Sequence, residues 1–297
     1  MESSQISPPT NLLVPLSSAV RGEKPGGRRI YLMRNAESCD RLGQAWRFGS
    51  FRDHGIYRQI DLNQPVKIVN RHPDAFKNDC PITQVGSLSA QLIGRGMAMK
   101  YCGIHTVYCS PALRCIQTAF SLLETAKTKI PPRICIEPGL MDPLMFYWQD
   151  QMPSFMKTSE LINAGYAIDQ DYEPLYSISQ MSERLYQEKT VSDVRERISK
   201  VVSIFLARSK EKPDGGVLVV THAPIIDIVM RSILDKKEYP KTIADLNRMG
   251  LFYPFCSVTT LEADPKTTEW NLMMDALPKL SYMHMSTTVE VPIFDLE

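Results

Sequence analysis

The feature that most constrains the fold of this chain is a set of three short, mainly apolar runs that each end at a polar or charged side chain. The runs cover residues 29–33, 106–109 and 217–221, and they lead into Arg34, Ser110 and His222. Runs this short and this apolar are typical of strands buried on both faces of a parallel sheet. Ligands of open α/β sheets bind outside the carboxyl ends of the strands. We therefore expect Arg34, Ser110 and His222 to surround one pocket.

Helical patterns separate these strands. Apolar side chains recur at helical spacing after Thr83, an N-cap type of residue, as far as about residue 100. Further helices are predicted for residues 112–125, for the amphipathic stretch from residue 192 onward, and from Pro224, which suits a first turn, to about residue 234. Further strands are predicted for residues 133–137, 255–261 and 270–273, and residues 39–80 and 141–190 are predicted to be long excursions. The alternation predicts an α/β fold, a three-layer sandwich with a mostly parallel sheet and helices on both faces.

Size and composition indicate one domain. The chain has 297 residues and 43% hydrophobic content, enough to bury one large core. Residues 1–28, rich in Ser, Pro and Gly, are predicted to be a disordered N-terminal segment, and residues 29–297 a single domain. A net charge of +1 gives no reason to expect a nucleic-acid partner. Since no apolar run approaches the roughly 20 residues of a membrane helix, no membrane span is expected.

The cysteines indicate a reducing compartment. There are seven, scattered through predicted strands and helices, and none has Cys-x-x-Cys spacing. This pattern is typical of reduced, buried thiols in a cytoplasmic protein. We expect no metal site and no cofactor.

Three motifs lie at or beside the predicted strand ends. They are Arg-Asn-Ala-Glu at residues 34–37, Val-Tyr-Cys-Ser-Pro-Ala-Leu-Arg-Cys-Ile-Gln-Thr-Ala at residues 107–119, and Val-Leu-Val-Val-Thr-His-Ala at residues 217–223. Together they resemble the strand-end motifs of the histidine phosphatase (phosphoglycerate mutase-like) superfamily. Residues 29–280 are more narrowly similar to the phosphatase domains of the suppressor-of-T-cell-receptor-signalling proteins and of insect ecdysteroid-phosphate phosphatase. That similarity includes Cys-Pro-Ile-Thr-Gln-Val-Gly at residues 80–86 and Ile-Cys-Ile-Glu-Pro-Gly-Leu at residues 134–140.

The resemblance implies roles for four residues. Arg34 and Arg114 match two arginines that bind phosphate, and a planar guanidinium can contact two phosphate oxygens at once. His222 matches a histidine that donates a hydrogen bond to the transferring phosphoryl group. Asp142 stands where the narrower relatives place a glutamate that acts as general acid. Aspartate keeps the charge but is one methylene shorter, and proton transfer requires close approach.

Three neighbouring positions depart from the pattern of the relatives. Asn35 occupies the position of the histidine that takes the phosphoryl group. An imidazole nitrogen can attack phosphorus, but the carboxamide nitrogen cannot, because its lone pair is delocalised into the carbonyl. Ser38 occupies the position of a further phosphate-binding arginine, so one neutral donor replaces five N–H groups. Ala36 replaces a glycine and adds a methyl group beside the anion.

These departures leave two functions in competition. The first is a catalytically impaired pseudophosphatase, a binding or interaction module that still grips a phosphorylated ligand through Arg34, Arg114 and His222. The alternative is a weak phosphatase that hydrolyses phosphomonoesters of proteins or small molecules with another nucleophile, such as water oriented by Asp142 or His222. A third hypothesis is that the arginines are structural and the pocket is empty. We favour the first because it explains Asn35 and Ser38 without a further assumption.

Residues 141–181 are the candidate partner surface. They are rich in Tyr, Phe, Trp and Met, and these residue types are enriched at protein interfaces. The alternative is that they form a lid over the pocket. The related phosphatase domains form homodimers, so the resemblance implies a second copy of this chain as one partner, beside an unidentified protein partner.

Overall fold

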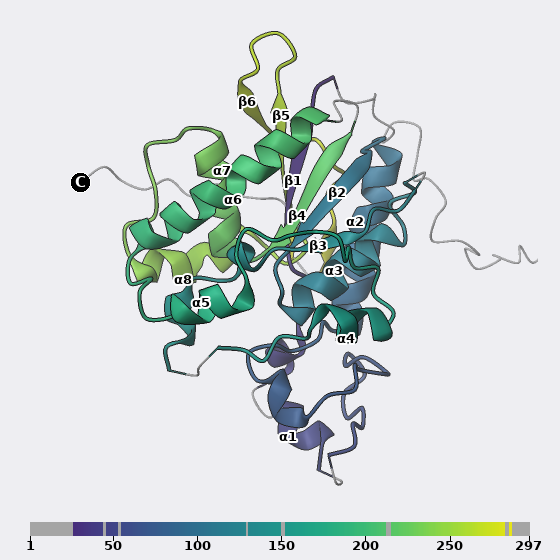
Figure 1. Ribbon diagram of the computed structural model, residues 1–297. Coiled ribbons are helices and arrows are strands. Elements are labelled where there is room, and N and C mark those ends of the chain that lie inside the picture. Colours follow the sequence, from purple (N-terminus) through teal and green to yellow (C-terminus); the bar gives the residue numbers. More distant parts are fainter. Residues whose placement is uncertain are drawn as a thin grey trace, which may run out of the picture.

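The computed structural model describes residues 26–43, 46–52, 55–128, 130–149, 152–211, 215–282 and 285–286, and Figure 1 shows its architecture. At its centre is a six-stranded sheet with strand order β3-β2-β4-β1-β5-β6. The strands are β1 (Arg29–Arg34), β2 (Ile104–Cys109), β3 (Ile134–Ile136), β4 (Gly216–Thr221), β5 (Val258–Ala263) and β6 (Trp270–Met273). Neighbours among β3, β2, β4 and β1 are parallel, whereas β5 and β6 are antiparallel. The predicted α/β sandwich with a mostly parallel sheet is confirmed.

Alternate strand residues face two different helical layers. In β4, Val217 and Val219 belong to one core cluster, and Leu218 and Val220 to another. The first cluster includes side chains of α6 (Val191–Glu211), α7 (Ala223–Ile233) and α8 (Ile243–Phe252), and the second includes those of α2 (Gln84–Met99) and α3 (Leu113–Leu123). Figure 1 shows the two helical groups on opposite sides of the sheet. Because both faces of β4 are covered, every residue of this strand is buried.

Two local signals place helix starts as predicted. The Thr83 hydroxyl accepts a hydrogen bond from the backbone N–H of Gly86 at 2.9 Å and so caps α2. Pro224 lies in the first turn of α7, whose N-cap residue is His222. His222 therefore sits at the junction between the end of β4 and the start of α7.

The two long excursions contain short helical pieces. The first holds η2 (Cys39–Leu42), α1 (Trp46–Ser50) and η3 (Pro73–Phe76), around a small core of its own. The second holds η5 (Leu144–Tyr147), α4 (Thr158–Asn163) and α5 (Ile178–Glu183), and η4 (Pro138–Leu140) precedes it. Of the aromatic residues among residues 141–181, Tyr147 and Tyr176 are buried, Trp148 is 37% exposed, and the other four are partly buried. Residues 141–181 therefore offer less exposed aromatic surface than their composition suggests.

The C-terminal elements, the cysteines and the N-terminal segment were also subjects of prediction. Helix α8 was not predicted, and the chain ends its described part with the small hairpin of β7 (Ser281–Tyr282) and β8 (Met285–Ser286). All seven cysteines are buried and free of disulfide bonds, as expected. No helix within the described ranges has both the length and the apolar character needed to cross a membrane. The predicted disordered segment, residues 1–28, lies outside the described residues except for residues 26–28.

Candidate active site

A cavity of about 310 Å³ lies beyond the carboxyl ends of β1 and β4. The six residues singled out from the sequence all line it: Arg34, Asn35, Ser38, Arg114, Asp142 and His222. The sheet accounts for Arg34, Asn35 and His222, because β1 and β4 are adjacent and parallel, with Arg34 paired opposite Thr221. Ser110 is the exception among the strand-end residues, since it is fully buried against the His222 ring and does not line the cavity.

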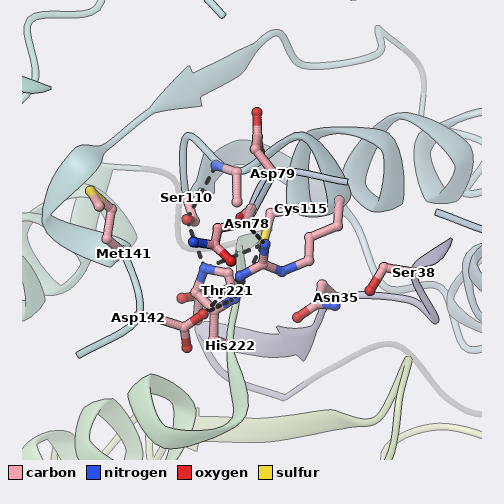
Figure 2. Close-up of polar contacts among 12 residues, drawn as sticks. Asn35, Ser38, Asn78, Asp79, Ser110, Cys115, Met141, Asp142, Thr221 and His222 are labelled. Carbon is pink, nitrogen blue, oxygen red and sulfur yellow. Dashed lines mark hydrogen bonds and ion pairs between the residues drawn. The ribbon is translucent and has the colours of Figure 1, made fainter. Parts of the chain in front are cut away.

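Arg114, Asp142 and His222 form a compact triangle at the cavity wall, and Figure 2 shows Asp142 beside His222. Arg114 Nη2 donates to Asp142 Oδ2 at 2.7 Å and lies 3.2 Å from His222 Nδ1. Asp142 Oδ2 lies 3.2 Å from the same ring nitrogen. Arg114 Nη1 donates to the backbone carbonyl of Asn78 at 3.2 Å. Asp142 is therefore long enough to reach the centre of the site, although it is shorter than glutamate.

His222 is held in its neutral form. Burial lowers the pKa of His222 well below its usual range, and the nearby charges of Arg114 and Arg34 lower it further. A neutral imidazole has one donor and one acceptor nitrogen. Because Arg114 can only donate, we assign Nδ1 as the acceptor and place the proton on Nε2, which lies 2.9 Å from Ser110 Oγ.

The carboxyl group of Asp142 is shifted in the direction expected of a general acid. Burial raises the pKa of Asp142 and outweighs the opposing effect of Arg114, its ion-pair partner. The site thus combines a histidine that resists protonation with a carboxyl group that holds its proton to higher pH than usual. A protonated carboxyl group can donate a proton, and a neutral imidazole can accept one or orient water.

Ser110, His222 and Asp142 lie in the order of a Ser–His–Asp triad, although His222 carries its proton on Nε2 and not on the Nδ1 that faces Asp142. Ser110, however, is 0% exposed, so its hydroxyl cannot meet a substrate in the cavity. Cys115 is equally buried, with Sγ 3.7 Å from His222 Nε2, and burial raises the pKa of its thiol to about 12. A thiol with so high a pKa is poorly reactive at neutral pH. Neither side chain is placed to act as a nucleophile.

On the opposite side of the cavity, Asn35 is satisfied by its own neighbours. Its Nδ2 donates to the carbonyl of Ala36 at 2.9 Å, and its backbone N–H donates to the carbonyl of Thr221 at 2.9 Å. Ala36 donates its N–H to Thr118 Oγ1 at 2.8 Å and is not among the residues with positive φ. The alanine therefore fits an ordinary backbone conformation at this point.

The hydroxyl of Ser38 is likewise hydrogen-bonded to a near neighbour in the chain. Its hydroxyl donates to Asp40 Oδ1 at 2.6 Å, and the Cys80 thiol lies 3.1 Å from the same oxygen. Burial raises the pKa of Asp40, but the hydrogen bonds from Ser38 and Cys80 and the charge of Arg114 outweigh it, so the net shift is downward. Asp40 is thus stabilised as a carboxylate at the edge of the cavity.

One guanidinium nitrogen of Arg34 is hydrogen-bonded to the backbone. Nη1 donates to the carbonyls of Gly250 at 3.0 Å and Tyr253 at 2.5 Å, and the guanidinium lies over the Phe255 ring at 3.9 Å. Nη2 and Nε form no hydrogen bond with the described residues. Burial lowers the pKa of Arg34 to about 10, with a further contribution from Arg41. Arg34 therefore combines a structural role at the end of α8 with free donors beside the cavity.

Sequence reasoning missed part of the cavity wall. Arg41, in η2, lines the cavity and lies over the same Phe255 ring, 5.5 Å from its centroid. Helix α8 and the residues after it add Leu246, Asn247, Gly250 and Phe255. Arg41 had no sequence signal, because its place depends on how η2 folds beside residues 250–255. A signal for α8 was present in the capping box of Thr242 and Asp245.

The described residues hold no group of three or more His, Cys, Asp or Glu side chains arranged to bind a metal ion. The charged groups of the cavity contact one another instead, as in the ion pair of Arg114 and Asp142. The chemistry that this arrangement supports is recognition of an anion by guanidinium groups.

The chain belongs to the histidine phosphatase superfamily (branch 1), whose family profile matches residues 75–276. The matched range includes Arg114, Asp142 and His222 but begins after the first strand. Asn35 and Ser38 lie before the matched range.

Among similar proteins are ecdysteroid-phosphate phosphatase of Drosophila melanogaster and ubiquitin-associated and SH3 domain-containing protein A of Homo sapiens. The first is 34% identical over 237 residues, which is 79% of this chain and 30% of the relative. The second is 26% identical over 258 residues, which is 86% of this chain and 38% of the relative. The chain thus spans roughly a third of the length of these relatives.

A solved structure has the same fold. It is the ecdysone phosphate phosphatase of the silkworm Bombyx mori in complex with tungstate, with a TM-score of 0.73 and 24% sequence identity. The superposition covers 90% of this chain and 98% of that chain. It confirms the phosphoglycerate mutase-like α/β fold.

Proposed function

We propose that this chain is a catalytically impaired pseudophosphatase that serves as a binding module for a phosphorylated ligand. The observation that carries the proposal is Asn35. Its carboxamide stands at the cavity wall where the resemblance calls for a nucleophilic histidine, and it hydrogen-bonds to its own backbone neighbour. An amide nitrogen has no available lone pair, so Asn35 cannot carry a phosphoryl group.

The other reactive side chains around the cavity do not replace it. Ser38 donates its hydroxyl to Asp40, and Ser110 and Cys115 are fully buried. Both ring nitrogens of His222 are engaged, Nε2 with Ser110 and Nδ1 with Arg114. A nucleophile from this set would first have to break a hydrogen bond or move out of the core.

The cationic groups support ligand binding. Arg34, Arg41 and Arg114 line the cavity, opposed by Asp40 and Asp142, which leaves one excess positive charge while His222 is neutral. Protonation of Asp142, favoured by its raised pKa, would increase that excess. The Drosophila relative is an ecdysteroid-phosphate phosphatase, and a phosphomonoester is the ligand we propose for this chain.

One observation favours the alternative, a weak phosphatase. A carboxyl group with a raised pKa beside a neutral imidazole is the state in which Asp142 could protonate a leaving group and His222 could orient water. Phosphomonoester hydrolysis in water is among the slowest reactions that enzymes accelerate. Without a covalent intermediate, positioning alone would leave a rate far below useful turnover.

The test compares binding with turnover in the same preparation. We expect calorimetry at low ionic strength to detect tungstate or phosphate binding, while hydrolysis of p-nitrophenyl phosphate at neutral pH stays at the level of the His222→Ala variant. Robust turnover that His222→Ala abolishes would refute the pseudophosphatase. The absence of both binding and turnover would leave the third hypothesis, structural arginines around an empty pocket.

We further propose that the chain acts in the cytoplasm as a homodimer or in complex with a protein partner. The resemblance to domains that form homodimers supports the dimer, and the seven free thiols support a reducing compartment. Light scattering should then give a mass of about 67 kDa, twice the chain mass of 33.7 kDa. For residues 141–181, the inward Tyr147 at the cavity wall favours the lid over the interface.

A further inference from the structure

Helix α6 carries a fully buried arginine that does not line the ligand cavity. Arg197 is 0% exposed and pairs with the buried carboxylate of Glu188. Arg197 Nε donates to Oε2 at 2.7 Å and Nη2 donates to Oε1 at 2.9 Å. Burying two charges has a large desolvation cost, and such a pair is weak evidence for stability by itself. The other hydrogen bonds of the pair show what it holds.

These hydrogen bonds go to the backbone on both sides of Asp142. Arg197 Nη1 donates to the carbonyls of Gly139 at 2.7 Å and Met141 at 3.1 Å, and Nη2 lies 3.5 Å from the carbonyl of Asp142 itself. Glu188 Oε1 accepts the backbone N–H of Leu144 at 2.7 Å. The Arg197–Glu188 pair thus holds the backbone of residues 139–144 on both sides of Asp142 through hydrogen bonds.

The same segment is tied to the strand that carries His222. The hydroxyl of Thr221, the last residue of β4, donates to the carbonyl of Leu140 at 2.7 Å. The carbonyls of residues 139–142 are therefore all held by side chains of α6 or β4. Asp142 meets His222 because both are fixed to this common framework.

We propose that Arg197 is a positioning residue for the site: from outside the cavity it fixes residues 139–144 so that the Asp142 carboxyl group meets Arg114 and His222. The part of this inference that concerns a ligand rests on the proposed function. The part that concerns the position of Asp142 does not, and the two can be measured separately.

The pKa of Asp142 reports whether its carboxyl group stays in place. The charged and titratable groups that face it are Arg114 and Cys115 from α3, His222 from the end of β4, Arg34 from β1, Arg197 from α6 and Tyr147 from η5. Burial is the largest influence on its pKa and raises it, whereas the positive charges lower it. If Asp142 leaves its place, burial is lost and its pKa falls toward that of an exposed aspartate.

The first experiment needs no ligand. The carboxyl carbon of Asp142, assigned with Asp142→Asn, is titrated by NMR in the wild type and in Arg197→Lys. Lysine keeps the charge but cannot reproduce the planar fork that holds three carbonyls. We expect the pKa of Asp142 to fall in Arg197→Lys. An unchanged pKa would overturn the inference.

A matched control separates positioning from general loss of a buried ion pair. Arg231 on α7 is 4% exposed and pairs with Asp227 at 2.8 Å, but it does not line the cavity or contact residues 139–144 through any hydrogen bond in the described part of the chain. Arg231→Lys should lower thermal stability as Arg197→Lys does and leave the pKa of Asp142 unchanged. An equal shift in both variants would show a structural effect only.

A second variant keeps the test decisive if Arg197→Lys does not fold. The double change Arg197→Met with Glu188→Leu replaces the pair by apolar side chains, which is often neutral or stabilising. It leaves the net charge unchanged but removes every hydrogen bond from α6 to the segment. We again expect the pKa of Asp142 to fall. A pKa equal to that of the wild type would refute the proposal that Arg197 positions Asp142.

The second experiment uses sulfate, whose double negative charge does not change over the range from mildly acidic to neutral pH. Calorimetry in buffers of different ionisation enthalpy gives the protons taken up on binding. We expect Arg197→Lys to lose the same part of this uptake as Asp142→Asn, and Arg231→Lys to keep it. If wild type does not bind sulfate, the proposed function fails, while the NMR titration still decides the role of Arg197.

Discussion

The two sides of the cavity are built in different ways. On one side, Arg114, Asp142 and His222 contact one another directly, within 2.7–3.2 Å. On the other side, Asn35 and Ser38 bond to residues one and two positions away in the chain. The first side is an assembly of segments far apart in the sequence, with its charges facing a common point. The second side is satisfied locally and presents no reactive atom.

This difference teaches how binding and chemistry can separate within one fold. Recognition of an anion requires donors held in place by the framework, and the first side has them. Covalent catalysis requires one specific nucleophilic atom, and the second side lacks it. The first side can therefore keep its geometry whatever residue stands at position 35, because the hydrogen bonds of Arg114 to Asn78, Asp142 and His222 do not involve Asn35.

The largest effect is expected when the second side is rebuilt. Asn35→His should give weak but measurable hydrolysis of p-nitrophenyl phosphate. Adding Ser38→Arg should raise kcat/KM further by about tenfold or more, since a guanidinium adds one or two charge-assisted hydrogen bonds to the dianion. His222→Ala in the double variant is the control and should abolish the gain. If the double variant stays inactive, the two sides are not complementary halves of one active site.

Next in size is the loss of the guanidinium at the centre of the first side. Arg114→Ala should reduce oxyanion affinity by roughly 10–100-fold, the value of one or two hydrogen bonds to a charged group. Calorimetry with tungstate measures it. Arg208→Ala removes an exposed arginine of α6 that pairs with Glu211 and should leave the affinity unchanged. Equal affinities for wild type and Arg114→Ala would place anion binding elsewhere.

The pH dependence of stability should report the buried His222. Its pKa is lowered well below 6.5 by burial and by Arg114, so below pH 6.5 the unfolded chain takes up a proton that the folded chain does not. Stability therefore rises with pH from the folded-state pKa up to about 6.5 and is lost as pH falls through this window, by at most about 1.4 kcal/mol per pH unit.

Urea unfolding at several pH values measures this slope. His222→Gln keeps hydrogen-bonding capacity without a titrating ring and should show a shallower slope than wild type. Parallel stability curves for the two proteins would mean that His222 is not held neutral in the folded state.

The smallest effect is expected at the rim of the second side. Arg41 lines the cavity but is exposed, so its attraction for an oxyanion is screened by solvent and salt. Arg41→Ala should weaken tungstate binding by a few-fold at low ionic strength and have no measurable effect at high salt. Lys200→Ala, on the exposed face of α6, is the matched charge control. A loss that persists at high salt would indicate a direct and desolvated contact instead.

The sequence by itself determined the layers of the fold and the residues that gather at the strand ends. Apolar runs such as residues 217–221, the N-cap Thr83 and the first-turn Pro224 act through local conformational preferences and periodic burial. These signals depend on neighbours within a few positions, so they can be found without the structure. Arg34 and His222 followed because parallel strands deliver their carboxyl ends to one edge. The other four cavity residues, Asn35, Ser38, Arg114 and Asp142, followed from the resemblance of their motifs to those of the histidine phosphatases.

Only the tertiary structure decided where the side chains at that edge point. Arg34 turns one nitrogen to carbonyls more than 200 positions away, and Asp142 is fixed by Arg197, 55 positions further along the chain. Arg41 joins the cavity wall through its position over Phe255, and no periodic pattern encodes that contact. Hydrogen bonds of this kind form between any donor and acceptor that the packed core brings together. Their identity is settled by the three-dimensional arrangement of distant segments, which a reading of local sequence does not contain.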